Sequence, residues 1–271
     1  MSIKLMYITN SVEIAQIAQR AGVDRIWIDM EYIGKDERQA GMDTVKSHHT
    51  IEDIKRMRPY IDKAELMVRV NPIHEGSEAE ISDAIEAGAD LIMLPMFKTV
   101  CEVQKFLDIV SGRTKTILLV ETKEAVEHIE EILSLKGIDE VHVGLNDLHL
   151  SYGRKFMFEL LADGTVEQII NKVKGHGYRY GFGGIARIGY GLLPAELILR
   201  EHYRLKSEMA ILSRSFCTAN KMTAYKEIEE LFSREIENIR QEEINVSELS
   251  NLELEENRKL VCKKVQEIIS N

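Results

Sequence analysis

Short runs of apolar residues alternate with amphipathic segments along most of this chain. The runs have the length and the composition of buried strands, and the segments between them have helical spacing. This order is typical of repeated strand and helix units around a parallel sheet. The predicted strands cover residues 3–8, 25–29, 65–70, 90–94, 116–120, 140–143, 178–183 and 208–212.

The helical pattern is clearest in two of the connecting segments. Residues 12–21 place Ile14, Ile17, Ala18 and Ala21 on one face, and residues 124–133 repeat the pattern. Eight such units within about 250 residues favour an α/β fold of the (β/α)8 TIM barrel type. The alternative is an open doubly wound sheet, which wants a glycine-rich phosphate loop after its first strand. The loop at that place contains no glycine.

Two segments depart from a minimal barrel. Residues 32–49 form a polar connection longer than most βα loops, which suggests a lid or a subunit contact. Residues 221–271 follow the last strand with helical spacing and few aromatic residues. We therefore predict a barrel domain over residues 1–220 and a helical extension over 221–271. The extension is either a pair of solvated helices or an arm that packs on a neighbouring subunit.

Composition narrows the class of protein. The 271 residues are 44% hydrophobic and 30% charged, as in a globular protein with a large core. A net charge of -10 and the lack of basic runs argue against a nucleic-acid partner. The sequence shows no membrane-length apolar stretch and no signal-peptide pattern, and its three cysteines are widely spaced. We expect a cytoplasmic protein with no membrane partner and a small-molecule substrate.

In a barrel the active site lies at the carboxyl ends of the strands, so the polar residues there are candidates for chemistry. Asp29 and Glu31 end the second strand, Arg69 the third, Glu121 the fifth, and Asp147 follows the sixth. Glu121 and Asp147 come from neighbouring strands, and two such carboxylates suit Mg²⁺ or Mn²⁺. The alternative is that each caps the helix that follows it.

Other residues at the strand ends suit substrate binding. The segment 144–147 offers backbone N–H groups at a helix N-terminus, where a carboxylate can bind. The Arg69 guanidinium can donate to a carboxylate or an enolate oxygen, or it can pair with Asp29 or Glu31, and the two roles are compatible.

Histidines and glycines give weaker signals. His48 and His49 lie in the long loop, either as solvated surface or as an acid or base that reaches the mouth. His142 lies on the sixth strand and is expected to face the helices. The glycine-rich run 181–184 can cradle a phosphate or make a turn.

The segments around these residues resemble the HpcH/HpaI aldolase/citrate lyase family of metal-dependent pyruvate aldolases, which fold as barrels of the phosphoenolpyruvate/pyruvate type. The likeness runs over about residues 5–185. The segments that carry it are Ala21-Gly22-Val23-Asp24, Ile28-Asp29-Met30-Glu31, Val68-Arg69-Val70-Asn71, Ala87-Gly88-Ala89-Asp90, Leu94-Pro95-Met96, Val120-Glu121-Thr122-Lys123-Glu124-Ala125, Gly137-Ile138-Asp139 and Gly144-Leu145-Asn146-Asp147-Leu148.

The resemblance implies a role for each matched position. Glu121 and Asp147 would bind the metal, and Arg69 would contact the pyruvate oxygen and stabilise the enolate. The backbone of Gly144, Leu145 and Asn146 would hold the pyruvate carboxylate, with Pro95 also in the substrate site.

The sequence departs from the family pattern at two places. The family commonly has a histidine directly after the glutamate that corresponds to Glu31, where it pairs with the aspartate as the acid/base dyad. Here that position is Tyr32, so His48, His49 or a metal-bound water would have to replace it. The segment 98–115 also lacks the arginine- and glycine-rich loop of many relatives.

The leading hypothesis is a class II aldolase, a carbon–carbon lyase that uses Mg²⁺, Mn²⁺ or another divalent metal. It would form or cleave a bond to a pyruvate-like 2-oxo acid through a metal-stabilised enolate, with an aldehyde or acyl partner. The alternatives are an acyl lyase of the citrate lyase or malyl-CoA type and a non-catalytic ligand-binding barrel that acts as a scaffold. The resemblance also implies a homo-oligomer.

Overall fold

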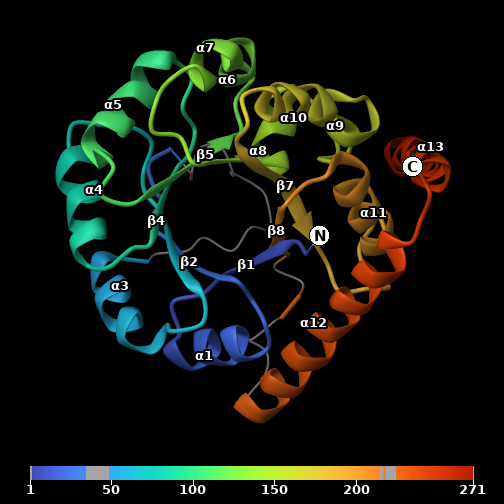
Figure 1. Cartoon of the computed structure of the whole chain (residues 1–271), viewed down its shortest axis with the longest axis horizontal. Coiled ribbons are helices and arrows are strands. Elements are labelled where there is room, and N and C mark those ends of the chain that lie inside the picture. The colour runs from blue at the N-terminus through green and yellow to red at the C-terminus, as the bar shows by residue number, and fades with distance from the viewer. Residues whose placement is uncertain (1, 35–48, 214–215, 218–223, 271) are drawn as a thin grey trace.

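The computed structural model describes residues 2–34, 49–213, 216–217 and 224–270. In this described part, eight parallel strands close into a barrel in which each strand pairs with its neighbours in sequence and β8 pairs with β1 (Figure 1). The predicted (β/α)8 barrel is confirmed, and each strand lies within two residues of its predicted ends. The strands are β1 Lys4–Ile8, β2 Arg25–Asp29, β3 Glu65–Arg69, β4 Leu91–Leu94, β5 Lys115–Val120, β6 Glu140–Val143, β7 Arg179–Ile185 and β8 Met209–Leu212.

Helices surround the barrel. The predicted helix 12–21 begins at the Ser11 side chain, which accepts the Ile14 N–H. The predicted helix 124–133 is two short helices that meet at His128. The helices are α1 Val12–Arg20, α3 Ile51–Met57, η1 Arg58–Tyr60, α4 Ser77–Glu86, α5 Val100–Val110, α6 Lys123–Glu127, α7 Ile129–Leu133, α8 Leu145–Ser151, α9 Glu159–Ala162, α10 Thr165–Gly175, α11 Ala195–Leu205, α12 Tyr225–Ser247 and α13 Asn251–Ser270.

The apolar residues form two cores because alternate residues of a strand face opposite sides of the barrel wall. The larger core lies between the strands and the helices. The smaller one fills the barrel and is rich in unbranched methionine side chains. Its buried members are Met6, Trp27, Met67, Leu91, Met93, Ile117, Leu119 and Met209.

Strand β7 differs from both sequence interpretations of its glycines. Gly181, Gly183 and Gly184 lie within the strand, so they form neither a turn nor a phosphate loop. A Cβ on Gly181 would stand 2.3 Å from the Met209 carbonyl oxygen, so the glycine allows β7 and β8 to approach closely. His142 of β6 is in register with Gly181, and a Cβ on that glycine would stand 2.9 Å from His142 Nδ1. The ring of His142 therefore faces the barrel interior, and the prediction that it faces the helices is wrong.

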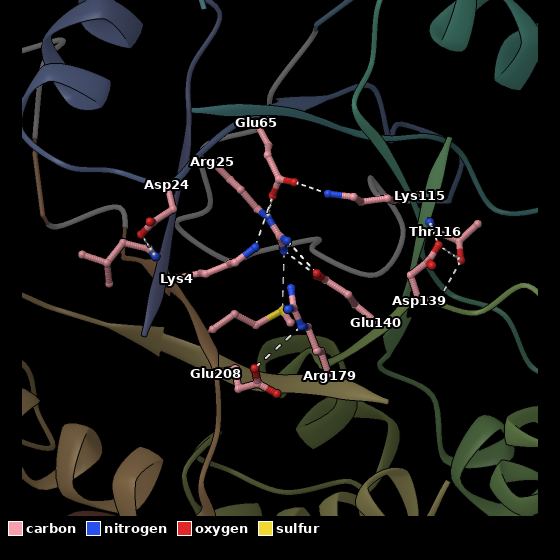
Figure 2. Close-up of polar contacts among 12 residues, drawn as sticks. Lys4, Asp24, Arg25, Glu65, Lys115, Thr116, Asp139, Glu140, Arg179 and Glu208 are labelled. Carbon is pink, nitrogen blue, oxygen red and sulfur yellow. Dashed lines mark hydrogen bonds and ion pairs between the residues drawn. The ribbon is translucent and has the colours of Figure 1, made fainter. Parts of the chain in front are cut away.

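Charged side chains close the end of the barrel where the strands begin. Figure 2 shows the Arg25 guanidinium between Glu65 and Glu140, with Lys4 and Lys115 directed at Glu65. Arg25 is fully buried and donates to both Glu140 oxygens, at 2.5 and 2.7 Å. This end of the barrel is thus filled by ion pairs, and the polar residues at the opposite end are left for chemistry.

The predicted extension forms α12 and α13, which lie against the chain's own barrel (Figure 1). Helix α12 packs on α1 and α11, and α13 packs on α11 and α9. Of the helices in the described residues, none has both the length and the hydropathy that a membrane crossing needs.

Candidate active site

Four acidic side chains and one arginine gather at the carboxyl end of the barrel. Asp29 and Arg69 are the last residues of β2 and β3 and lie in register, while Glu121 directly follows β5. Asp147 lies in the first turn of α8, next to β6. Asp29, Glu31, Arg69 and Glu121 are buried. The structure therefore brings together the residues that the sequence analysis took from the strand ends.

Asp29 and Glu31 hold the Arg69 guanidinium in place. Its Nε and Nη2 donate to the two oxygens of Asp29, at 2.8 and 2.9 Å, and Nη2 lies 3.2 Å from Glu31 Oε2. The indole of Trp27 lies beneath it, 5.0 Å from ring centroid to Cζ. Burial acts to lower the pKa of Arg69, but the charges of Asp29 and Glu31 outweigh it and raise that pKa. The result is a permanent cation in a fixed orientation.

The carboxylate of Glu121 lies among other acids. Burial raises its pKa well above the usual range, and the negative charges of Glu31 and Asp147 raise it further. Arg69 and the Met96 N–H, which donates to Oε1 at 3.1 Å, act in the opposite direction. Three acids thus face one another, two of them buried, and a bound cation or a retained proton would relieve their repulsion.

Backbone geometry makes room for Glu121. A Cβ on Gly144 would stand 2.8 Å from Glu121 Oε2 and 3.1 Å from Leu119 Cδ1, so a larger residue at 144 would force the carboxylate to shift. Met96 has a left-handed φ of 53°, uncommon for a residue with a side chain, and its N–H binds Glu121. Sequence patterns carry no sign of this φ, so the role of Met96 could not be predicted from the sequence.

Neither predicted metal ligand is the N-cap residue of the helix that follows it, since these residues are Gly144 for α8 and Thr122 for α6. Asp147 does lie in the first turn of α8, where a negative charge is favourable, while its charge also acts on Glu121. Glu121 caps nothing, since the N-cap of α6 is Thr122, whose hydroxyl accepts the Ala125 N–H. The predicted substrate residues flank this place. Pro95 and Leu145 are buried, and Asn146 is half-buried.

His49 joins the site from the far end of the long connection. Its Nδ1 accepts the Asp29 N–H at 3.0 Å. A neutral His49 ring therefore carries its proton on Nε2. His48 lies outside the described residues. At the near end of the connection, Asn71 Oδ1 accepts the N–H groups of Tyr32 and Ile33.

The oxygen donors define what the site can hold. Across the described ranges, no three histidine, cysteine or acidic side chains are grouped closely enough to enclose a metal ion by themselves. Glu121 and Asp147 are nevertheless hard oxygen donors, and Mg²⁺ is often held by one or two carboxylates plus water and substrate oxygens. These oxygen donors therefore suit a cation that also binds water or substrate, and they suit less well an ion enclosed entirely by protein side chains.

The sequence matches the HpcH/HpaI aldolase/citrate lyase family over residues 4–156, more than half of the chain. This chain belongs to that family. Every polar residue discussed above at the strand ends, from Asp29 to Asp147, lies inside the matched segment.

Individual members of the family are distant from this chain. The 2-keto-3-deoxy-L-rhamnonate aldolase of Escherichia coli is 22% identical over 169 residues, which are 51% of this chain and 58% of that enzyme. This chain thus spans little more than half the length of the curated relative it matches.

Solved structures agree on the barrel. An HpcH/HpaI aldolase/citrate lyase family protein from Burkholderia cenocepacia superposes with a TM-score of 0.62 at 17% identity, covering 78% of this chain and 88% of that one. The citrate synthase SbnG superposes with a TM-score of 0.61 at 16% identity, covering 89% of this chain and 94% of that one. At these identities the likeness shows the fold alone.

Proposed function

We propose that this chain is a divalent-metal-dependent carbon–carbon lyase that forms or cleaves a bond to a pyruvate-like 2-oxo acid. The observation that carries the proposal is the buried set of acids around Glu121, next to the fixed cation of Arg69. Membership of a family named for aldolases and citrate lyases supports the reaction class.

Glu121 and Asp147 would hold Mg²⁺ or Mn²⁺. The raised pKa of Glu121 supports the fit of these two residues to a cation. That pKa reflects burial and the facing carboxylates, whose negative charge a divalent cation would neutralise. When bound, such an ion supplies a positive charge that stabilises negative charge on the oxygens of the 2-oxo acid.

Arg69 stabilises the oxygen on which negative charge develops when the bond to the 2-oxo acid forms or breaks. Asp29 and Glu31 occupy Nε and Nη2, and no acceptor for Nη1 occurs among the residues that the structure describes. A donor oriented before the reaction loses little free energy to reorganisation. The first N–H groups of α8, on Leu145 and Asn146, bind the substrate carboxylate because they have no partner within the helix.

His49 moves the proton. Tyr32, at the position that the family commonly gives to a histidine, has a side chain that is 63% exposed. His49 instead contacts the backbone at the end of β2, and its neutral form carries an N–H at Nε2. To accept a proton from the substrate, the ring must use Nδ1, so the Asp29 N–H has to release that nitrogen first.

Hydrogen exchange at the pyruvate methyl group tests this proposal without knowledge of the second substrate. We expect the protein to exchange these protons for deuterium in D₂O when Mg²⁺ or Mn²⁺ is present, and to stop when a chelator removes the ion. Glu121→Gln and Asp147→Asn should each lower the rate at least a hundredfold, because each removes a carboxylate that would hold the ion, and the charge of the ion stabilises the transition state.

Glu127→Gln is the matched control, because Glu127 is an exposed acid on α6. Binding of Mn²⁺, followed by its electron paramagnetic resonance signal, separates loss of the ion from loss of chemistry. Full exchange in Glu121→Gln and Asp147→Asn would refute the proposed roles of these residues.

A further inference from the structure

Arg187 lies in the connection between β7 and α11, residues 186–194, which leaves the barrel at the same end as the active site. Strand β7 pairs with β6, and α8 lies against β7. Gly183 of β7 lies close to the start of α8, since a Cβ on this glycine would stand 2.7 Å from the Leu145 side chain. The connection that carries Arg187 is therefore next to the helix to which the proposed function assigns the substrate carboxylate.

The positive charge of Arg187 lacks a counterion in the described part of the chain. No carboxylate there lies within ion-pair distance of it, and its buried Nε has no hydrogen-bond acceptor. Other arginines on α11 and near α8 do have carboxylate partners, although the buried Nε of Arg200 also has no acceptor among the described residues. Arg154 pairs with Asp163, Arg200 with Glu242, and Arg204 with Glu167.

One side chain of the same loop stacks on this guanidinium, and hydrogen bonds shape the loop backbone. The ring of Tyr190 lies under it, with Cζ 4.2 Å from the ring centroid. The Tyr190 N–H donates to the Arg187 carbonyl, and the Ala195 N–H donates to the Tyr190 carbonyl. Glu196 is the acidic residue nearest to Arg187 in the sequence. Its Oε1 accepts the Gly189 N–H, so this acid contacts the loop backbone.

We propose that Arg187, stacked on Tyr190, binds an oxoanion group, a carboxylate or a phosphate, of the second substrate. A guanidinium stacked on one face keeps its N–H edge free for paired hydrogen bonds, which match the oxygens of these groups. Connections after the seventh and eighth strands of such barrels frequently bind phosphate. The inference rests on the proposed function for its place in the reaction, and it gives the aldehyde or acyl partner an anionic end.

Calorimetric titration of the full chain tests this site. The probes are glycerol 3-phosphate and succinate, with glycerol and succinamide as neutral counterparts, at low ionic strength. Mg²⁺ and saturating oxalate are present so that the 2-oxo acid site is filled. We expect the wild-type protein to bind one of the anions and neither neutral probe, and the anion that binds identifies the group as phosphate or carboxylate.

Variants then assign the binding to Arg187. Arg187→Gln should weaken the binding at least tenfold. Arg187→Lys should weaken it less, because lysine keeps the charge but lacks the paired N–H donors of a guanidinium. Tyr190→Ala should also weaken it, whereas Tyr190→Phe should retain it. The matched control is Arg179→Gln, at the opposite end of β7, where the arginine lies 3.9 Å from Glu208. Circular dichroism verifies that each variant is folded.

Two outcomes overturn the inference. One is a wild-type protein that binds neither anion, and the other is Arg187→Gln that binds as tightly as the wild type. Pyruvate exchange by the wild-type protein separates this failure from failure of the proposed function. Exchange without anion binding refutes the Arg187 site alone. Anion binding that depends on Arg187, without exchange, refutes the lyase proposal and leaves an oxoanion site on the barrel.

Discussion

Single residues decide whether the acids at the mouth can lie side by side. Glu121 has room beside the other acids because Gly144 has no side chain, and the Met96 N–H donates to its carboxylate. The cost is repulsion, visible in the raised pKa of Glu121, which burial and the neighbouring acids together cause. The residues that shape such a site are therefore as informative as the ones that would bind a ligand.

Gly144→Ala should displace Glu121, because the new methyl group would stand 2.8 Å from its Oε2. We expect Mn²⁺ affinity to fall at least tenfold, about 1.4 kcal/mol or more, while the protein stays folded. Isothermal titration calorimetry measures the affinity. Gly175→Ala is the control, since a Cβ there meets no atom within 4 Å. Unchanged affinity in Gly144→Ala would contradict the expected displacement of Glu121 from the ion.

Two buried histidines should make stability depend on pH. Burial lowers the pKa of His142 to about 4 and that of His202 to about 3, from an ordinary value of 6.5. The unfolded chain then binds more protons than the folded one, so stability falls as pH drops from 6.5 toward 4. Each histidine contributes at most about 1.4 kcal/mol per pH unit.

Urea denaturation of His142→Gln at several pH values measures that dependence. The glutamine amide can still donate to the Gly183 carbonyl, which His142 Nε2 contacts at 3.1 Å. Between pH 6.5 and about pH 5 the variant should lose stability less steeply than the wild type. Equal slopes would mean that His142 is protonated in the folded protein or does not titrate separately.

Among the elements, the two ends of the barrel strands differ in how their charges are paired. Where the strands begin, Arg25 of β2 and Glu140 of β6 reach across the barrel and satisfy each other's charge (Figure 2). Where the strands end, the acids outnumber the arginine that they contact. Satisfied charges at one end suit stability, and unbalanced charges at the other suit binding of a cation.

Arg25→Met should destabilise the barrel by about 3–5 kcal/mol, because it leaves the buried Glu140 carboxylate without its partner. Adding Glu140→Gln should recover part of that loss, since the uncompensated charge is then gone. Lys115→Met, which removes a partly exposed partner of Glu65, should cost less than about 1 kcal/mol. Urea denaturation compares them, and a double variant less stable than Arg25→Met would contradict this account.

At the scale of the whole molecule, the terminal extension completes the larger core. Helix α12 buries Phe232 against Tyr7 and Phe216, with ring centroids 5.0 and 5.5 Å apart. It also binds the start of the chain, where the Ile3 N–H donates to Glu243 at 2.7 Å. The extension thus covers its own barrel here, and a homo-oligomer built through it stays a prediction.

Phe232→Ala should lower the free energy of unfolding by about 3–5 kcal/mol, because the side chain is fully buried and its removal leaves a cavity. Tyr225→Ala, at the exposed start of α12, should change it by less than about 0.5 kcal/mol. Both values come from urea denaturation. A small effect of Phe232→Ala would mean that α12 contributes little to the stability of the barrel.

The sequence by itself determined the order of elements and the residues at their ends. Alternation of apolar runs and helical spacing reports burial locally, so it located the strands of the barrel and placed Arg69, Glu121 and Asp147 at one end. The family motifs lie in those same segments, because strand ends carry both the fold and the chemistry.

Only the tertiary structure decided how these residues meet. The ring of His142 faces inward because of its position on β6, in register with Gly181, and Gly181 lies in β7, where it allows β8 to approach closely. The contact of His49 with Asp29 spans the long connection, and Met96 binds Glu121 through a backbone angle with no signature in the sequence. Arg187, which has no counterion among the described residues, is another feature that only the tertiary structure reveals. Such features depend on residues far apart in the chain, whereas hydrophobic periodicity describes only neighbours along it.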